Sequence, residues 1–96
     1  MLTSIDTFSS ALLNTLTLQQ RFHAIVAGQT SSQSLNSYGD IRSFKLPNSG
    51  LAVWYCTKYF QMAPGRELLE PDMPVPLTAA DYFSGRDAVL EAVLRR

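Results

Sequence analysis

The stretch DTFSSALLNTLTLQQRFHAIVAG, residues 6–28, decides the fold. Small polar residues precede an apolar series that repeats near every 3.6 residues, and this pattern predicts a helix. Phe8, Leu12 and Leu16 form one apolar stripe of that helix, and Leu13 and Leu18 add a second face. A helix that is apolar on more than one side is expected to lie between two layers of structure.

A short apolar run at residues 24–27 follows this helix and stops at Gly28. Such a run is typical of a buried strand. Residues 1–4 read as the end of another strand, directly before the helix. Strand, helix and strand in this order form a βαβ unit, so we expect an α/β fold, present here as an α+β fragment.

The middle of the chain predicts a β-hairpin. A polar stretch at residues 29–37 is expected to be a surface loop, and strand-like runs follow at residues 41–46 and 51–60. They flank the turn sequence PNSG, residues 47–50, whose Pro, Asn and Gly suit special backbone angles. Both alternating rows of the second run are apolar, so we expect that strand to be buried on both faces.

The last third of the chain predicts an extended segment and two helices. Residues 61–77 contain Pro64, Pro71, Pro74 and Pro76, which favours extended chain with one edge strand. The sequence TAAD at residues 78–81 has the form of a capping box and starts a short helix. Gly85 interrupts it, and Asp87 is expected to cap a C-terminal helix.

Composition excludes several classes of function. The 96 residues carry eight basic and eight acidic side chains, a net charge of zero, and so lack the positive charge that nucleic acids and anionic membranes attract. No run approaches the roughly 18 apolar residues that a membrane span requires. We therefore expect neither nucleic acid as a partner nor a membrane span.

The residues that commonly bind metals are isolated. The single cysteine, Cys56, excludes an intrachain disulfide and a multi-cysteine zinc site. His23 stands alone among apolar neighbours, and both residues are expected to be structural core residues. The five glycines are too scattered for a phosphate-binding loop. We predict no metal and no cofactor.

Two adjacent serines, Ser9 and Ser10, are predicted to lie at the start of the first helix, after a strand. Free backbone N–H groups at a helix N-terminus favour negative charge, so one turn can present a nucleophile and stabilise an oxyanion. The alternative is a purely structural role, because serine is also a favoured N-cap residue.

Five motifs stand in order along the chain: TFSSA at residues 7–11, FKLPNSGL at 44–51, TKYF at 57–60, EPD at 70–72 and DYFSGRDAVLEA at 81–92. Together they resemble the tail-specific, or C-terminal-processing, serine peptidases. The resemblance runs from about Leu2 to Leu94 and concerns the C-terminal part of the catalytic domain. It implies that residues 1–96 are a single partial domain of that kind.

The resemblance implies a crotonase- or ClpP-like fold, whose nucleophilic serine begins a helix after a strand. It places this serine at Ser9, and Ser10 is the alternative because the doubled serine permits a shift of one residue. The backbone N–H of Ser10 would then contribute to the oxyanion hole. The substrate implied is a polypeptide, cleaved through an acyl-enzyme.

The chain departs from the family at the general base. Many members use a lysine whose place falls near Ser34, but residues 28–41 contain no lysine. Tricorn-like members use a histidine from an earlier segment and a glutamate near the Pro-Asp motif. Glu67 and Glu70 are candidates for this acidic partner, and solvated surface carboxylates are the alternative interpretation.

Two hypotheses follow. The first is a segment of a serine peptidase that is inactive in isolation because its base is missing and that acts on polypeptides only when upstream sequence completes it. The second is a non-catalytic, degenerate peptidase-like module that acts in binding or oligomerisation. Strands at residues 24–27 and 51–60 would expose apolar faces or unpaired edges, so we expect a homo-oligomer, most simply a symmetric dimer.

Overall fold

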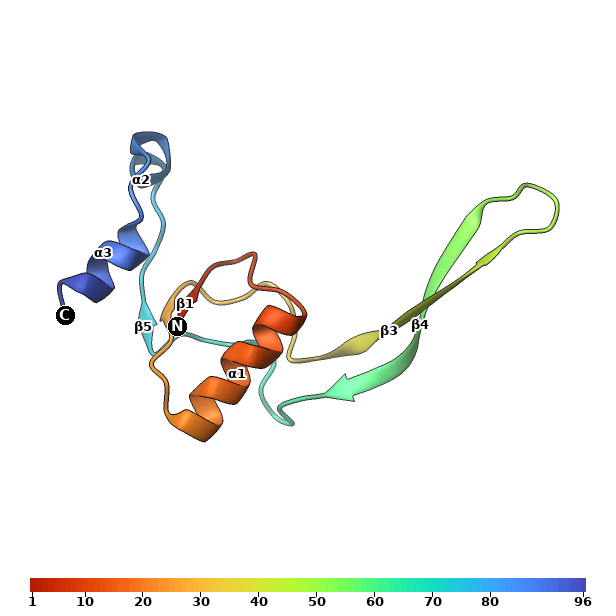
Figure 1. Cartoon of the computed structure of the whole chain (residues 1–96), viewed down its shortest axis with the longest axis horizontal. Helices are drawn as coiled ribbons and strands as arrows, with labels where there is room; N and C mark the ends of the chain where they lie inside the picture. The colour runs from red at the N-terminus through yellow and green to blue at the C-terminus, as the bar shows by residue number, and fades with distance from the viewer. The chain divides into compact units, whose positions relative to one another are not determined.

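The computed structural model describes residues 1–96 and shows a mixture of helices and sheets, which confirms the predicted class at this coarse level (Figure 1). The chain forms two compact units, which we call the sheet unit (Met1–Ser34 and Leu68–Arg96) and the hairpin unit (Leu35–Glu67). The elements in chain order are β1 (Leu2–Thr3), α1 (Ser10–Phe22), β2 (Ala27–Gly28), β3 (Asn36–Lys45), β4 (Ala52–Gln61), β5 (Met73–Pro74), α2 (Ala79–Ser84) and α3 (Ala88–Leu94).

The sheet unit is built on three short parallel strands in the order β1-β2-β5. β1, α1 and β2 form the predicted βαβ unit, although β2 covers only Ala27–Gly28 instead of residues 24–27. The predicted edge strand is confirmed as β5, where Pro74 pairs with Gly28. Proline is tolerated there because the outer side of an edge strand needs no N–H donor.

The core of the sheet unit lies under one face of α1. Leu12 and Leu16 are 0% and 3% exposed, and Val26 and Leu69 are equally well buried. Leu13, by contrast, is 47% exposed, so the prediction that α1 is covered on more than one side is wrong. Phe8 is not part of the buried stripe, because α1 begins two residues later, at Ser10, and leaves Phe8 exposed.

The two C-terminal helices begin as predicted. Thr78 and Asp81 form a complete capping box at the start of α2, and α2 ends at Gly85. The Asp87 carboxylate accepts the Leu90 N–H at 2.9 Å and caps α3. None of the helices has the length and apolar character that crossing a membrane requires.

The hairpin unit is a two-stranded antiparallel ribbon whose register runs from Asn36–Gln61 to Lys45–Ala52, with Asp40, at a φ of 55°, outside the ladder (Figure 1). The predicted turn is confirmed: Leu46 donates its N–H to the Leu51 carbonyl oxygen at 2.9 Å, and Gly50 has a φ of 70°. β3 begins earlier than predicted, because residues 36–39 pair with β4 although their polar sequence resembles a loop.

The expected burial of β4 on both faces is wrong. Every β4 residue except half-buried Val53 is exposed, and Trp54 is 69% exposed. A two-stranded ribbon has no further strand or layer to cover its side chains, so they contact one another instead. The Tyr38 and Tyr59 rings, for example, have centroids 4.9 Å apart. Cys56 is likewise an exposed free thiol and not the expected core residue.

Candidate active site

Ser9 occupies the turn between β1 and α1, directly before the first helical residue, Ser10. Its backbone angles are φ 52° and ψ −119°, a conformation that non-glycine residues rarely adopt. Holding such a conformation costs about 1–3 kcal/mol, and strain of this kind is concentrated at functional sites. In α/β-hydrolases, a strained strand-to-helix turn exposes the nucleophilic serine.

The Ser9 side chain does not serve as a helix cap. Although Ser9 is the N-cap residue of α1, its hydroxyl makes no cap hydrogen bond. The structural role considered from sequence is therefore not observed. The first turn is closed by backbone bonds instead: the N–H of Ala11 donates to the Phe8 carbonyl at 3.1 Å, and that of Leu13 donates to the Ser9 carbonyl at 3.1 Å.

The backbone N–H of Ser10 has no acceptor within the chain. It is one of the N-terminal helix donors that α1 cannot satisfy internally. Both Ser9 and Ser10 are exposed. A nucleophile with a backbone donor on the next residue is one component of an oxyanion hole.

A second loop, residues 29–34, is bonded to the turn that carries Ser9. The Gln29 N–H donates to the Thr3 carbonyl at 3.0 Å, and the Gln29 side chain accepts the Ile5 N–H at 3.4 Å. Ser32 donates to the Ile5 carbonyl through both its N–H, at 3.1 Å, and its hydroxyl, at 2.8 Å. This loop follows β2, and the turn that carries Ser9 follows β1. Because β1 and β2 are parallel neighbours, the loop and the turn lie at the same end of the sheet.

Gln33 makes a direct hydrogen bond between this loop and Ser9. Its side-chain oxygen accepts the Ser9 backbone N–H at 2.5 Å. The loop includes Ser34, the place where the family resemblance puts a lysine, but the side chain beside Ser9 is a neutral amide. Sequence reasoning missed Gln33 because a glutamine in a polar loop belongs to no chemical motif, and only the fold places it beside a serine 24 residues away.

His23 is not positioned to act on Ser9. It is the C-cap of α1 and has a left-handed backbone, and its N–H donates to the Leu18 carbonyl. The 13-residue helix separates the two residues by about 20 Å along its axis. His23 is also exposed, so the prediction that it is a core residue is wrong. It lies at the C-terminal end of α1, beyond the buried part of the helix.

The two glutamates proposed as acidic partners are exposed, and their carboxylates form no ion pair. Glu70 belongs to the sheet unit and follows Leu69, whose carbonyl accepts the Ser31 N–H at 3.3 Å. The chain at Glu70 therefore runs beside the loop that holds the Ser9 turn. Glu67 belongs to the hairpin unit, where its carbonyl accepts the Leu35 N–H at 2.7 Å.

Charged side chains gather on the segment that carries α2 and α3. Arg86 pairs with Glu91, which also pairs with Arg95 at 2.9 Å, and Asp81 lies 3.7 Å from Arg86. The hydrogen bond from Arg86 lowers the pKa of Glu91, and the Thr78 hydroxyl lowers the pKa of Asp81. These acids are held ionised, so they are unsuited to take up a proton from a serine near neutral pH.

A cavity of about 390 Å³ opens at the carboxyl ends of β1 and β2. Ser4 and Gln29, from the two loops around Ser9, line one side of it, and Leu77, Tyr82 and Val89 add apolar surface. Ligands of α/β proteins commonly bind at the carboxyl ends of parallel strands. We call this cavity the strand-end cleft.

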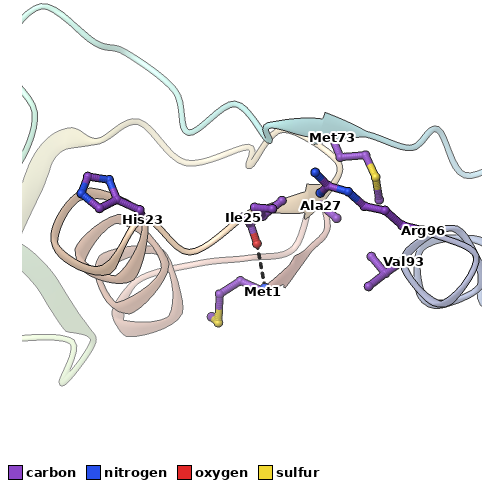
Figure 2. Close-up of a pocket in the computed structure, with 7 residues that line it drawn as sticks. All are labelled: Met1, His23, Ile25, Ala27, Met73, Val93 and Arg96. Carbon is purple, nitrogen blue, oxygen red and sulfur yellow. Dashed lines mark hydrogen bonds between the residues drawn. The ribbon is translucent and has the colours of Figure 1, made fainter.

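A larger cavity of about 660 Å³ lies elsewhere in the sheet unit (Figure 2). Its lining includes Ile25, Ala27, Met73 and Val93, and Figure 2 shows Arg96 reaching over it from beyond the end of α3. The Met1 amino group donates to the Ile25 carbonyl at 2.9 Å at its border. Its lining contains neither Ser9 nor a residue of the loop that bonds to Ser9, so it is separate from the candidate active site.

No group of three or more His, Cys, Asp and Glu side chains is placed to hold a metal ion. Comparison with known proteins found no matching family model, no matching curated protein and no matching solved structure.

Proposed function

We propose that this chain is a segment of a serine-type peptidase, the C-terminal portion of a crotonase- or ClpP-like catalytic domain, with Ser9 as the nucleophile. The observation that carries the proposal is the Ser9 turn itself: a strained, uncapped, exposed serine followed by an unpaired Ser10 N–H. The ordered motifs that resemble the tail-specific peptidases, and the parallel arrangement of β1, β2 and β5, support it.

In the proposed reaction, a general base from outside these residues takes the Ser9 hydroxyl proton as the Ser9 oxygen attacks a peptide carbonyl, whose oxygen becomes an oxyanion that accepts the Ser10 N–H. The protonated base gives this proton to the leaving amine as the C–N bond breaks, and water then hydrolyses the acyl-enzyme. The strand-end cleft, which has apolar walls at Leu77 and Tyr82, would receive part of the polypeptide.

The proposed reaction requires a general base that these residues do not supply. A serine needs a general base within hydrogen-bonding reach, and the side chain that hydrogen-bonds to Ser9 is the neutral amide of Gln33. The isolated chain is therefore proposed to be inactive, and the base to come from sequence outside these residues.

A serine-reactive fluorophosphonate tests the proposal. We expect no labelling of the isolated chain at neutral pH and slow labelling when imidazole is added as an external base. Peptide mapping should locate the label at Ser9, so Ser9→Ala should abolish it while the matched control Ser10→Ala retains it. Labelling that survives in Ser9→Ala would assign the nucleophile to another residue and contradict the proposal.

The second candidate function is a non-catalytic module for binding or oligomerisation. The observation that favours it is the hairpin unit, where aromatic side chains on both strands are exposed, including Tyr38, Phe44 and Trp54. Large exposed apolar side chains gathered on one unit are a feature of interaction sites. Self-association together with complete inertness to the imidazole-assisted reagent would favour this candidate over the peptidase segment.

A further inference from the structure

The Ser9 turn is held by one side chain that comes from a distant part of the chain. The Gln33 side-chain oxygen lies 2.5 Å from the Ser9 nitrogen and accepts its N–H. A backbone N–H can donate to this oxygen only when the peptide between Phe8 and Ser9 faces the loop, so the bond selects one orientation of that peptide. Ser9 is also the residue with the unusual φ of 52° at the start of α1.

The loop that carries Gln33 is itself fixed. The Ser31 N–H donates to the Leu69 carbonyl at 3.3 Å, Ser31 is 2% exposed, and its hydroxyl donates to the Gln33 carbonyl at 3.4 Å. Ser32 is bonded twice to Ile5. Gln33 therefore reaches Ser9 from a rigid support, which is the condition under which a strained conformation persists.

We propose that Gln33 is the positioning residue of the Ser9 nucleophile. Its bond to the Ser9 N–H keeps φ positive, which leaves the Ser9 hydroxyl uncapped and the Ser10 N–H directed away from the helix. Without this bond, the turn relaxes toward an ordinary N-cap, in which the serine oxygen folds back onto the N–H groups of the first helical turn. That Gln33 positions a nucleophile rests on the proposed function, whereas the hydrogen bond between Gln33 and Ser9 does not depend on it.

Amide hydrogen exchange of the full chain, followed by NMR, tests the bond directly. Gln33→Met keeps the length of the side chain and removes the acceptor, and we expect the Ser9 amide to exchange about tenfold faster or more. Gln33→Glu retains an acceptor oxygen and should restore slow exchange. Ser32→Ala is the matched control, because Ser32 lies in the same loop but its hydroxyl bonds to Ile5. It should leave the Ser9 amide unchanged.

The imidazole-assisted fluorophosphonate reaction tests the catalytic meaning. In Gln33→Met we expect the maximal labelling rate to fall at least about tenfold while the half-saturating reagent concentration stays constant, because the nucleophile is misplaced and the cleft is intact. Gln33→Glu should recover most of the rate. Equal loss in Ser32→Ala would assign the effect to general loosening of the loop and overturn the positioning role.

The two readouts separate the two proposals. The Gln33 bond is refuted if the Ser9 amide exchanges fast in the unmodified chain or if Gln33→Met leaves its exchange rate unchanged. This holds whether or not Ser9 reacts with the fluorophosphonate. Protection that depends on Gln33, together with labelling that maps to a residue other than Ser9, retains the bond and refutes the nucleophile.

Discussion

Thr3 and Gly28 are partners in neighbouring parallel strands, and a Cβ atom on Gly28 would lie 2.0 Å from the Thr3 carbonyl oxygen. Gly28 also has a φ of 128°, outside the range that side chains tolerate. The same carbonyl accepts the Gln29 N–H at 3.0 Å, so this close approach is where the loop beside Ser9 begins.

Gly28→Ala should destabilise the protein severely. Because the clash is with backbone and the φ is unfavourable as well, we expect a loss of about 3 kcal/mol or more in the free energy of unfolding. Denaturant unfolding monitored by circular dichroism measures it. Gly50→Ala is the control, because its φ is 70° but nothing lies within 4 Å. It should lose only about 1–2 kcal/mol. Similar losses in both variants would show that the Thr3 contact is unimportant.

Ser9→Gly should stabilise the chain while it removes the proposed nucleophile. Glycine adopts the Ser9 backbone angles without strain, and the substitution removes no side-chain cap bond. Glycine also raises the conformational entropy of the unfolded chain, but the relief of backbone strain is larger, so we expect a net gain of about 1 kcal/mol in the free energy of unfolding. Thermal unfolding measures the gain. Ser10→Gly, within the regular helix, should instead destabilise by about 0.5–1 kcal/mol. A destabilised Ser9→Gly variant would mean that Ser9 is not strained.

Acid should weaken the start of α2. The Thr78 hydroxyl, the Thr78 backbone and Arg86 lower the pKa of Asp81. The folded pKa lies below the ordinary value of about 3.9, so the stabilisation is complete above that pH and is lost as the pH falls through the lowered pKa. An NMR titration should give an Asp81 midpoint that rises in Thr78→Ala. The control Thr57→Ala should raise the midpoint of Asp40 only, because Thr57 bonds to Asp40. An Asp81 midpoint unchanged by Thr78→Ala would exclude the capping box as the cause.

The exposed hairpin should make the chain self-associate. We expect a dimer at micromolar concentration in sedimentation equilibrium, and Trp54→Ser, at a side chain that is 69% exposed, should weaken dimerisation at least about tenfold without unfolding the chain. Phe83→Ser is the control: it removes an even more exposed ring, at 84%, from α2. A stable, well-folded monomer at this concentration would contradict the expectation.

Local features of the sequence were predicted correctly, because nearby residues determine them. The capping box of Thr78 and Asp81 and the turn at residues 47–50 depend on contacts within a few residues. The βαβ order and the proline-containing edge strand also follow from local patterns. Phe8 was expected in the buried stripe of α1 but precedes the helix, and the Ser9 N–H bonds to Gln33, a partner far along the chain that a local pattern does not show.

Burial was the least predictable property. Alternation in β4 correctly indicated a strand, but an apolar side chain such as Trp54 does not specify what covers it. The same limit applies to His23 and Cys56, which were expected in the core and are exposed. For the candidate site, sequence indicated where a nucleophile could lie, and only tertiary structure could identify the side chain that supports it.

The loop that fixes Ser9 grows directly from β2, so the geometry of the turn and the pairing of the sheet form one cooperative unit. When β2 separates from β1 in a partial opening, the bonds from Gln29, Ser32 and Gln33 are lost together, and the serine returns to ordinary backbone angles. The Ser9 geometry is therefore present only in molecules in which the central strand is paired. If Ser9 is the nucleophile, as proposed, a process that loosens this strand would remove its activity before the chain unfolds as a whole.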